Sequence, residues 1–355
     1  MNYEFDDELD DELDDEIELV DEIDVDDESD DDAVDEIAAP REKPDLQTTL
    51  DAIKSSEGIS AAVFYGLSDL TDADGVTFRD VWFMLDDERR RNLMRQMVEI
   101  GEANFEFDYS GVGWIALDDS DPVVREAAIE ALWESESTTV LHRLLEMAQW
   151  DESREVRAAA ASGIGRFILL SELGDYSESE GLKAQDIVLN ILNNEDEDVE
   201  VRRRALEALS GSSNEALESA IRDAYEGGDR SMQISSVFAM GRSFDEQWVE
   251  TVMRELDSDD PEMRYEAARA AGELMIPDAL PALTRMAFEN DRELQNNAIW
   301  SLGEIGGKEA VRVLTTLSTA AQETEDEDLI ESLEDALAAA NVTGDLYMLK
   351  VEDDE

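Results

Sequence analysis

The sequence predicts an all-α protein: an α-α superhelix of stacked antiparallel helix pairs that follows a disordered acidic N-terminal tail. A short pattern recurs six times, in which Arg or Gln is followed by a small residue three places later and by another six places later. The last four copies are 31 residues apart, a period typical of a supersecondary unit rather than of one helix face. The six copies start at Arg125, Arg157, Arg202, Gln233, Arg264 and Gln295.

Composition excludes several functional classes. The formal net charge is −65 over 355 residues, which argues against unassisted binding to nucleic-acid phosphates and against anionic membrane surfaces. The chain has no Cys, so disulfides and Cys nucleophiles are absent. Its first residues do not resemble a secretory signal and no apolar run could span a membrane, so we expect a cytoplasmic protein. Two explanations of the acidity stay open. It reflects a salt-rich or hot habitat, or it forms a surface that binds a partner.

The predicted acidic tail covers residues 1–44. The first forty residues carry 22 acidic side chains and no Lys or Arg, a composition typical of disorder. Four apolar residues within it are spaced four apart and would form one stripe of a helix: Phe5, Leu9, Leu13 and Ile17. Two hypotheses stay open. The stripe anchors the tail in a basic groove of a partner or of the same chain, or the tail only solubilises the protein.

Residues 45–85 are predicted to form a helical capping region, with one or two short helices before residue 66 and a loop from Ser68 to Gly75. The loop contains the letters DADG, which are similar to part of a calcium loop. Aligning Gly75 with the sixth position of that loop places Leu70 first and Val81 twelfth, and neither can bind a cation. We therefore predict a helix-capping turn with Asp74 as the N-cap.

Residues 86–341 are predicted to form the solenoid, beginning with a helix from Asp86 to Glu102. Each repeat starts at an Asp or Ser cap, and its small residues share a face that allows close helix packing. Four repeats have Gly eight places after the Arg or Gln, which predicts a helix stop: Gly165, Gly241, Gly272 and Gly303. Second helices are predicted at 139–150, 182–193, 215–225, 246–256, 278–288 and 309–317.

Three further expectations concern the array. About fourteen extra residues between Arg157 and Arg202 predict a projecting polar loop around residues 173–181. The repeated Arg side chains are expected to pair with Asp residues of the same or the next repeat, as a ladder linking successive units. Residues 326–340 have lost the pattern, as expected of a capping repeat, and residues 342–355 are predicted to be a short acidic C-terminal tail.

The run from Asp121 to Leu132, DPVVREAAIEAL, and its echo from Asp260 to Gly272, DPEMRYEAARAAG, resemble HEAT repeats. They are similar in particular to the phycobilisome lyase HEAT-like repeat family, and the resemblance spans about residues 118–340. It implies an armadillo-type solenoid of helix pairs. Because this family includes lyase subunits, scaffolds, regulators and metal enzymes, the resemblance implies no single activity.

Two enzymatic relatives set expectations for chemistry. Deoxyhypusine hydroxylase is a HEAT-like enzyme that holds iron with repeated His-Glu pairs, whereas this chain has one His, His142, followed by Arg143. Bilin lyases pass a tetrapyrrole to a Cys of another protein, and no residue here matches a bilin site by motif. We expect His142 to be structural, and we predict no catalytic residue, no cofactor site and no metal site.

Positive charge clusters in two arginine islands, which we predict as docking sites for an acidic segment because guanidinium groups suit carboxylates and phosphates. The alternative is that neighbouring Asp and Glu neutralise them. Aromatic side chains on the array either pack in the core or form an exposed binding strip. The islands comprise Arg89, Arg90, Arg91 and Arg95, and Arg202, Arg203 and Arg204. The aromatic residues are Trp150, Phe238, Trp248, Phe288 and Trp300.

The leading functional hypothesis is a non-enzymatic scaffold or adaptor that binds another protein through its inner curved surface, with the acidic tail as a regulatory or secondary contact. The alternative is a subunit of a bilin lyase or a chromophore-handling chaperone, whose visible spectrum would shift with bilin. A third hypothesis is a nucleic-acid mimic that occupies a basic groove of its partner, with binding that weakens steeply as salt increases.

Overall fold

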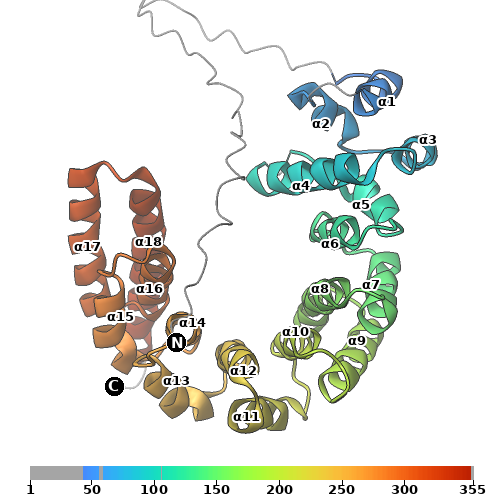
Figure 1. Ribbon diagram of the computed structural model, residues 1–355. Coiled ribbons are helices and arrows are strands. Elements are labelled where there is room, and N and C mark those ends of the chain that lie inside the picture. The colour runs from blue at the N-terminus through green and yellow to red at the C-terminus, as the bar shows by residue number, and fades with distance from the viewer. Residues whose placement is uncertain (1–42, 56–58, 105, 353–355) are drawn as a thin grey trace, which may run out of the picture. The chain divides into compact units, whose positions relative to one another are not determined.

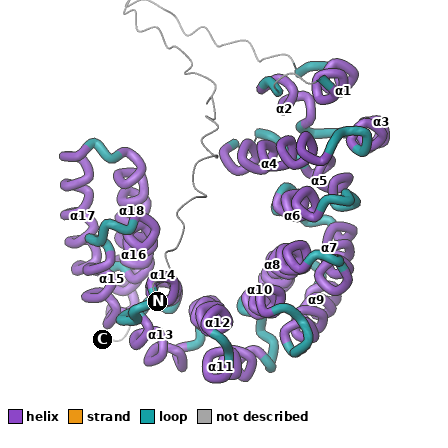
Figure 2. The backbone as a smooth tube through the Cα atoms, viewed as in Figure 1, coloured by secondary structure: helices purple, strands orange, loops and turns teal. Residues whose placement is uncertain are grey.

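The computed structural model describes residues 43–55, 59–104 and 106–352, with side chains described up to residue 342. All regular secondary structure in these residues is helical, so the predicted all-α class is confirmed (Figures 1 and 2). Residues 43–355 form one compact unit. The predicted acidic tail up to residue 42, with its stripe of Phe5, Leu9, Leu13 and Ile17, lies outside the described residues.

Five helices precede the repeats. They are α1 (Leu46–Lys54), α2 (Ala61–Leu67), α3 (Asp72–Trp82), α4 (Asp87–Ala103) and α5 (Ser110–Ala116). The predicted helix from Asp86 to Glu102 is confirmed as α4, with Asp86 as its N-cap. The region predicted to cap the solenoid therefore contains three helices, and α3 occupies the second half of the predicted loop.

The start of α3 corrects the predicted cap. Thr71, not Asp74, is the N-cap: its hydroxyl accepts a hydrogen bond from the Asp74 backbone N–H, and the Asp74 carboxylate accepts one from the Thr71 backbone N–H. Such a reciprocal capping box satisfies two free amides at once, which a cap at Asp74 would not. Asp74 and Gly75 consequently lie within the first turn of the helix.

The repeats form two layers of helices (Figure 1). The first-helix layer, in which each helix contacts the next one along the array, contains α6 (Pro122–Glu130), α8 (Arg154–Leu173), α10 (Val199–Leu209), α12 (Arg230–Arg242), α14 (Pro261–Glu273) and α16 (Arg292–Ile305). The second-helix layer contains α7 (Thr138–Trp150), α9 (Glu178–Leu192), α11 (Leu217–Gly227), α13 (Val249–Glu255), α15 (Leu280–Met286) and α17 (Gly307–Thr324). Short 3-10 turns, η1 (Glu246–Trp248) and η2 (Pro277–Ala279), precede α13 and α15.

Every helix of the first-helix layer starts at the predicted cap. The side chain of the residue four places before the repeated Arg or Gln accepts a backbone N–H of the first turn in all six helices. This bond satisfies one of the amides that a helix start leaves without a partner. The six caps are Asp121, Ser153, Asp198, Asp229, Asp260 and Asp291.

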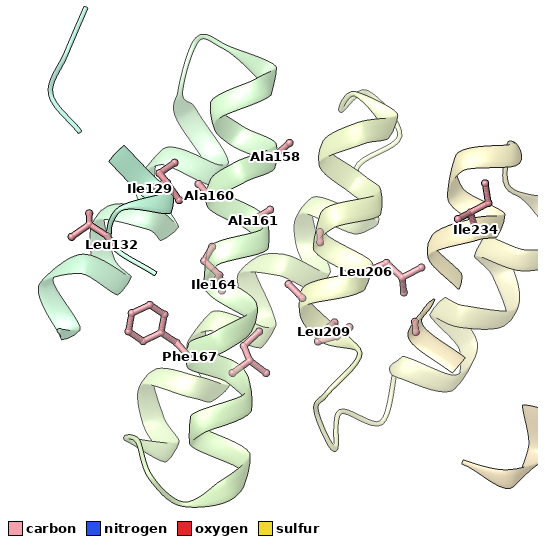
Figure 3. Close-up of a cluster of buried hydrophobic side chains, with 14 of the residues drawn as sticks. Ile129, Leu132, Ala158, Ala160, Ala161, Ile164, Phe167, Leu206, Leu209 and Ile234 are labelled. Atoms are coloured by element: carbon pink, nitrogen blue, oxygen red, sulfur yellow. The ribbon is translucent and has the colours of Figure 1, made fainter. Parts of the chain in front are cut away.

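The core is a continuous set of apolar side chains between the layers. Figure 3 shows part of it, where Ile129 lies on α6 and Leu132 just after that helix, Ile164 and Phe167 lie on α8, and Leu206 lies on α10. The small residue three places after each repeated Arg or Gln is fully buried, as predicted from its position on the packing face. Burial of this apolar surface is the main source of stability in such an array.

The four glycines predicted to stop helices instead lie inside them, and this prediction is wrong. A Cβ added at Gly272 would lie 2.9 Å from the Ser301 Cα, and one at Gly165 would lie 2.9 Å from the Ala208 Cα. Gly241 and Gly303 approach Ala270 and Ala336 in the same way. We call these contacts the glycine seam: the Gly eight places after the repeated Arg or Gln packs against a small residue of the helix stacked on it. Only a residue without a side chain permits such close approach.

The prediction of a projecting loop around residues 173–181, between α8 and α9, is also wrong. Helix α8 continues to Leu173 and α9 begins at Glu178, so most of the extra residues lengthen the two helices. The connection is short, and Gly174 ends α8 in the left-handed conformation that favours glycine, with a φ of 82°. The second helix starts four residues before the predicted Leu182.

The array ends in one long helix, α18 (Glu327–Glu352), which packs against α16 and α17. Leu333 and Ala340 of α18 are fully buried, in agreement with a final capping unit. The helix continues past residue 342, so the predicted start of a C-terminal tail lies within it, because residues 345–350 (DLYMLK) are mostly good helix formers. No helix in the described ranges is long and apolar enough to cross a membrane.

Candidate partner-binding surfaces

The repeated Arg and Gln side chains have one contact in common: each donates to a backbone carbonyl group at the end of the preceding helix or in the turn that leads to its own helix. Arg264 Nη1 donates to the Ser258 oxygen at 3.0 Å, and Gln233 Nε2 donates to the Tyr225 oxygen at 3.1 Å. The other four make equivalent bonds. Since a neutral amide donates as well as a guanidinium here, this contact explains why Gln replaces Arg in two repeats.

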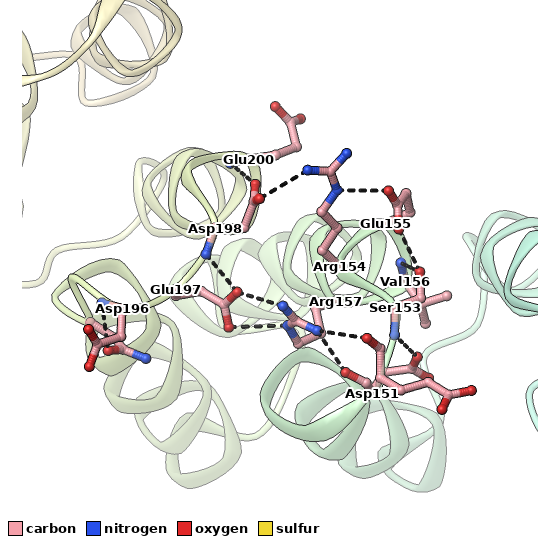
Figure 4. Close-up of polar contacts among 12 residues, drawn as sticks. Asp151, Ser153, Arg154, Glu155, Val156, Arg157, Asp196, Glu197, Asp198 and Glu200 are labelled. Atoms are coloured by element: carbon pink, nitrogen blue, oxygen red, sulfur yellow. Dashed lines mark hydrogen bonds and ion pairs between the residues drawn. The ribbon is translucent and has the colours of Figure 1, made fainter.

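The predicted ladder of ion pairs is present in two of the six repeats. Arg125 binds both Asp151 oxygens, at 2.7 and 2.9 Å, and Arg157 binds both Glu197 oxygens, at 2.8 and 3.1 Å (Figure 4). Both pairs run from a first helix to the turn before the next one. Arg202 and Arg264 make no ion pair with any described residue and instead donate to backbone oxygens. The prediction that ion pairs link every repeat to the next is therefore wrong beyond the second repeat.

Substituting Gln for the repeated Arg should therefore have unequal effects. Arg264→Gln keeps a donor for the carbonyl groups, and we expect the free energy of unfolding to change by less than about 1 kcal/mol. Arg125→Gln leaves the buried Asp151 carboxylate without its bidentate partner, and we expect a loss of about 1–3 kcal/mol. Urea unfolding followed by circular dichroism measures both, and equal losses would contradict the distinction.

The first arginine island is largely engaged in contacts within the chain. Arg90 is buried beside Asp119, and Arg91 pairs with the buried carboxylate of Asp121. Arg89 donates to the Ile53 backbone oxygen at 3.3 Å. Arg95 is exposed and donates to Asn92. Three of the four side chains thus connect α4 to α1 and to the turn before α6.

The second island is neutralised by carboxylates. Arg203 pairs with Glu200 and Glu207, and Arg204 pairs with the same two residues. Arg202 donates to the Leu192 backbone oxygen at 2.9 Å. These contacts fit the alternative in which neighbouring Glu residues neutralise the island. Docking of the acidic tail on either island stays a prediction, because the tail lies outside the described residues.

His142 connects two second helices at the surface. Its Nε2 lies 2.6 Å from Glu180 Oε2 on α9, and the Lys183 Nζ lies 3.4 Å from the same nitrogen. The hydrogen bond from His142, together with Lys183, lowers the pKa of Glu180 below its ordinary value. The side chain bridges α7 and α9, as expected of a structural His. Among the described residues, no three His, Asp or Glu side chains are arranged to hold a metal ion.

The aromatic residues divide into buried and exposed sets. Trp248 is 5% exposed, while Trp150, Trp300 and Phe288 are 78%, 41% and 55% exposed. Phe238 is partly covered by Arg269, whose guanidinium lies 3.8 Å from the ring centre. Two further exposed Trp residues escaped the sequence prediction because they lie outside the repeat helices or next to a helix end: Trp114 and Trp133.

A groove opens between the end of α4 and the end of α6, with a volume of about 560 Å³. Its aromatic residues are Phe107, Tyr109 and Trp133, and its acidic residues include Glu102, Glu130 and Glu134. We call it the acidic aromatic groove. It combines exposed aromatic surface with several carboxylates, which is the composition that attracts a cation.

The carboxylates of this groove carry no internal counter-charge. Glu102, Glu130 and Glu134 form no ion pair with any residue in the described part of the chain, in contrast to Glu207 of the third repeat. Although much of the Glu130 side chain is accessible to solvent, the groove walls desolvate its carboxylate and raise its pKa, and the charges of Glu126 and Glu102 raise it further.

Several carboxylates with raised pKa values predict that stability increases on mild acidification. Burial raises the pKa of Glu126, Glu130, Glu266 and Glu273 above the ordinary 4.5. The folded chain therefore binds more protons than the unfolded chain just above pH 4.5, and stability falls as pH rises through that window. Relief of the net charge acts in the same direction.

The opposite trend is expected in stronger acid. Hydrogen bonds from Arg230 and Arg292 lower the pKa values of Asp260 and Asp326, so their contributions are lost below the ordinary 3.8. The urea midpoint should rise as the pH is lowered from neutral towards 4.5 and should fall below the ordinary Asp value of 3.8, and Glu266→Gln should flatten the rise. A midpoint that increases steadily from pH 5 to 8 would contradict this expectation.

Comparisons with known proteins agree with the helical architecture. A sequence profile of HEAT repeats matches residues 111–184 and 249–338. No curated protein matches the chain significantly.

Solved structures of helical proteins align with the chain at low identity. YibA from Escherichia coli is 16% identical over 76% of this chain and 98% of its own, with a TM-score of 0.39. Human deoxyhypusine hydroxylase is 14% identical over 83% and 96%, with a TM-score of 0.33. Importin beta is 11% identical over 83% and 47%, with a TM-score of 0.38. The phycobilisome lyase subgroup and a lyase role stay predictions. The profile match and the helix pairs described above show that the chain contains HEAT repeats within residues 111–184 and 249–338.

Proposed function

We propose that the chain is a protein-binding scaffold whose partner presents a basic segment. The observation that carries this proposal is the unequal neutralisation of its carboxylates: those largely buried between helices are paired, whereas those lining the acidic aromatic groove are not. Glu207 and Glu273 are paired with Arg side chains of the same chain, whereas Glu102, Glu130 and Glu134 have no such partner among the described residues. Unpaired like charges at one place raise the local potential and favour a positively charged ligand.

The solenoid supports this proposal through its geometry. A stack of helix pairs exposes the same helix positions repeat after repeat, and those positions vary in sequence while the packing positions do not. Five places after the repeated Arg or Gln stand Glu130, Ser162, Glu207, Phe238, Arg269 and Trp300. Among these residues, Glu130 and Trp300 are exposed and available for recognition, whereas Glu207, Phe238 and Arg269 are engaged in contacts within the chain.

The acidic tail is proposed as a secondary contact for the same partner. Residues 1–40 add 22 carboxylates and no positive charge, which would strengthen attraction of a basic segment over distances beyond direct contact. A partner held by both elements would bind with a steep dependence on salt. Location of the protein in the cytoplasm is part of the same proposal.

Affinity capture tests the proposed function. The full chain and a form without residues 1–40 are immobilised and exposed to lysate at low salt, and bound proteins are released by a salt gradient. A specific protein with a Lys- or Arg-rich segment should elute late from the full chain and earlier from the shortened one. The purified candidate must then bind in solution by calorimetry. Recovery of general chaperones alone would overturn the scaffold proposal.

A further inference from the structure

We propose that the acidic aromatic groove is the docking site for a Lys or Arg side chain within an extended basic segment of the protein partner. This inference rests on the proposed scaffold function and assigns its binding site. The groove is lined by residues of α4, of α6 and of the segment between α4 and α5. Helices α4 and α6 lie next to each other near the N-terminal end of the repeat array (Figure 1). Its volume of about 560 Å³ lies within the range of ligand pockets and accommodates one long side chain with part of its backbone.

The aromatic part of the groove is held in place before any ligand arrives. The rings of Phe107 and Tyr109 are stacked with centroids 6.1 Å apart and planes 5° apart, and Tyr65 meets Phe107 edge-on at 6.0 Å. Tyr109 is 3% exposed and its hydroxyl has no hydrogen-bond partner in the described chain. A prearranged aromatic surface reduces the entropy that a bound cation must overcome.

Trp133 provides the exposed aromatic face. It occupies the place, eight residues after Arg125, where four other repeats have the glycine of the seam. Because α6 ends at Glu130, Trp133 lies beyond the first helix, and its side chain is 58% exposed. The backbone oxygens of Trp133 and Ser135 accept hydrogen bonds from Arg166 on α8, which fixes the turn.

The carboxylates complete the recognition of a cation. Glu130 is the last residue of α6 and Glu134 lies in the turn that follows it, and Glu102 lines the same groove from α4. The neighbouring Arg166 is already engaged with two backbone oxygens and with Glu136. An incoming guanidinium or ammonium group would therefore meet carboxylates and aromatic faces that lack an internal cation, which matches the chemistry of Arg and Lys.

A short peptide titration tests this assignment on the full chain. The probe is a peptide with one Arg flanked by glycines and with blocked ends, and the control peptide has norleucine in place of Arg. Indole N–H signals of the six Trp residues are followed by NMR, and Trp133→Phe identifies the Trp133 signal. The Trp133 signal should move with the Arg peptide and stay in place with the norleucine peptide.

Two charge-matched double variants separate the groove from general electrostatic attraction. Glu130→Gln with Glu134→Gln should weaken peptide binding about tenfold. Glu246→Gln with Glu250→Gln removes the same charge from the second-helix layer and should change binding less than about twofold. A Trp133 signal that does not move, or equal weakening in the two double variants, would overturn the groove as the docking site.

Failure of this inference is distinguishable from failure of the proposed function. If a captured partner binds the Glu130 and Glu134 double variant as tightly as the unchanged chain, the groove assignment is wrong and the scaffold function stands. If no specific partner is captured, the scaffold function fails, while the peptide titration still reports on the groove.

Discussion

Asp119→Ala is expected to lower the free energy of unfolding by about 3–5 kcal/mol. The Asp119 side chain is fully buried, accepts a hydrogen bond from the Trp82 indole at 2.8 Å, and lies 2.8 Å from Arg90 Nε. It also accepts the backbone N–H of Asp121 at 2.9 Å. Removing this carboxylate leaves the buried Trp82 indole N–H without its partner, and it leaves the buried Arg90 guanidinium with only the exposed Asp87 carboxylate and the Leu85 backbone oxygen. The change falls where α3 and α4 meet the repeats.

The neighbouring residue provides the matched control. Asp118 pairs with Arg79 at 2.9 Å and with Arg143 at 3.1 Å, but its side chain is 44% exposed. Asp118→Ala should therefore change stability by no more than about 1 kcal/mol. Urea unfolding compares the two variants, and hydrogen exchange should locate the Asp119→Ala effect in α3 to α6. Similar losses in both variants would contradict the importance of burial at Asp119.

Gly272→Val is expected to destabilise the array by about 3 kcal/mol or more. The new Cβ would lie 2.9 Å from both Cα and Cβ of Ser301, so two helix backbones must move apart. That movement also threatens the buried hydrogen bond from the Ser301 hydroxyl to the Ala268 oxygen, which is 2.8 Å long. Chemical unfolding measures the loss, and exchange protection should decrease most in α14 to α18.

Gly227 serves as the control for this change. It is the last residue of α11, and a Cβ added there meets no atom within 4 Å. Gly227→Val should be close to neutral, because Gly and Val differ little in helix propensity once packing is absent. A loss at Gly227 as large as that at Gly272 would show that helix propensity, and not the glycine seam, determines the result.

Much of the solenoid could be predicted because the same capping residues and the same spacing of small residues recur in each repeat. The caps at Asp121 and Asp260 follow from side-chain hydrogen bonding to free amides, and the buried small residues follow from helix periodicity. Both depend on residues within a few places of one another. The helix pairs followed from these signals with an error of a few residues at their ends.

The errors have a common physical cause, which is that contacts between repeats override local preference. Gly272 has low helix propensity, and so it was interpreted as a stop; its role is determined by Ser301 on the next helix. The acidic aromatic groove was missed for the same reason, since Glu102 and Glu130 come together only after folding. A sequence signal did exist: Trp133 stands where other repeats have Gly.

The glycine seam also determines how the molecule comes apart. Each first helix packs mainly on the next one in its layer and on its own second helix, and at the glycine seam the two backbones approach most closely. Opening one seam would release the helices on one side while those on the other keep their own contacts. Cooperativity is therefore a property of each junction, and segments of the chain can open and close without loss of the whole fold.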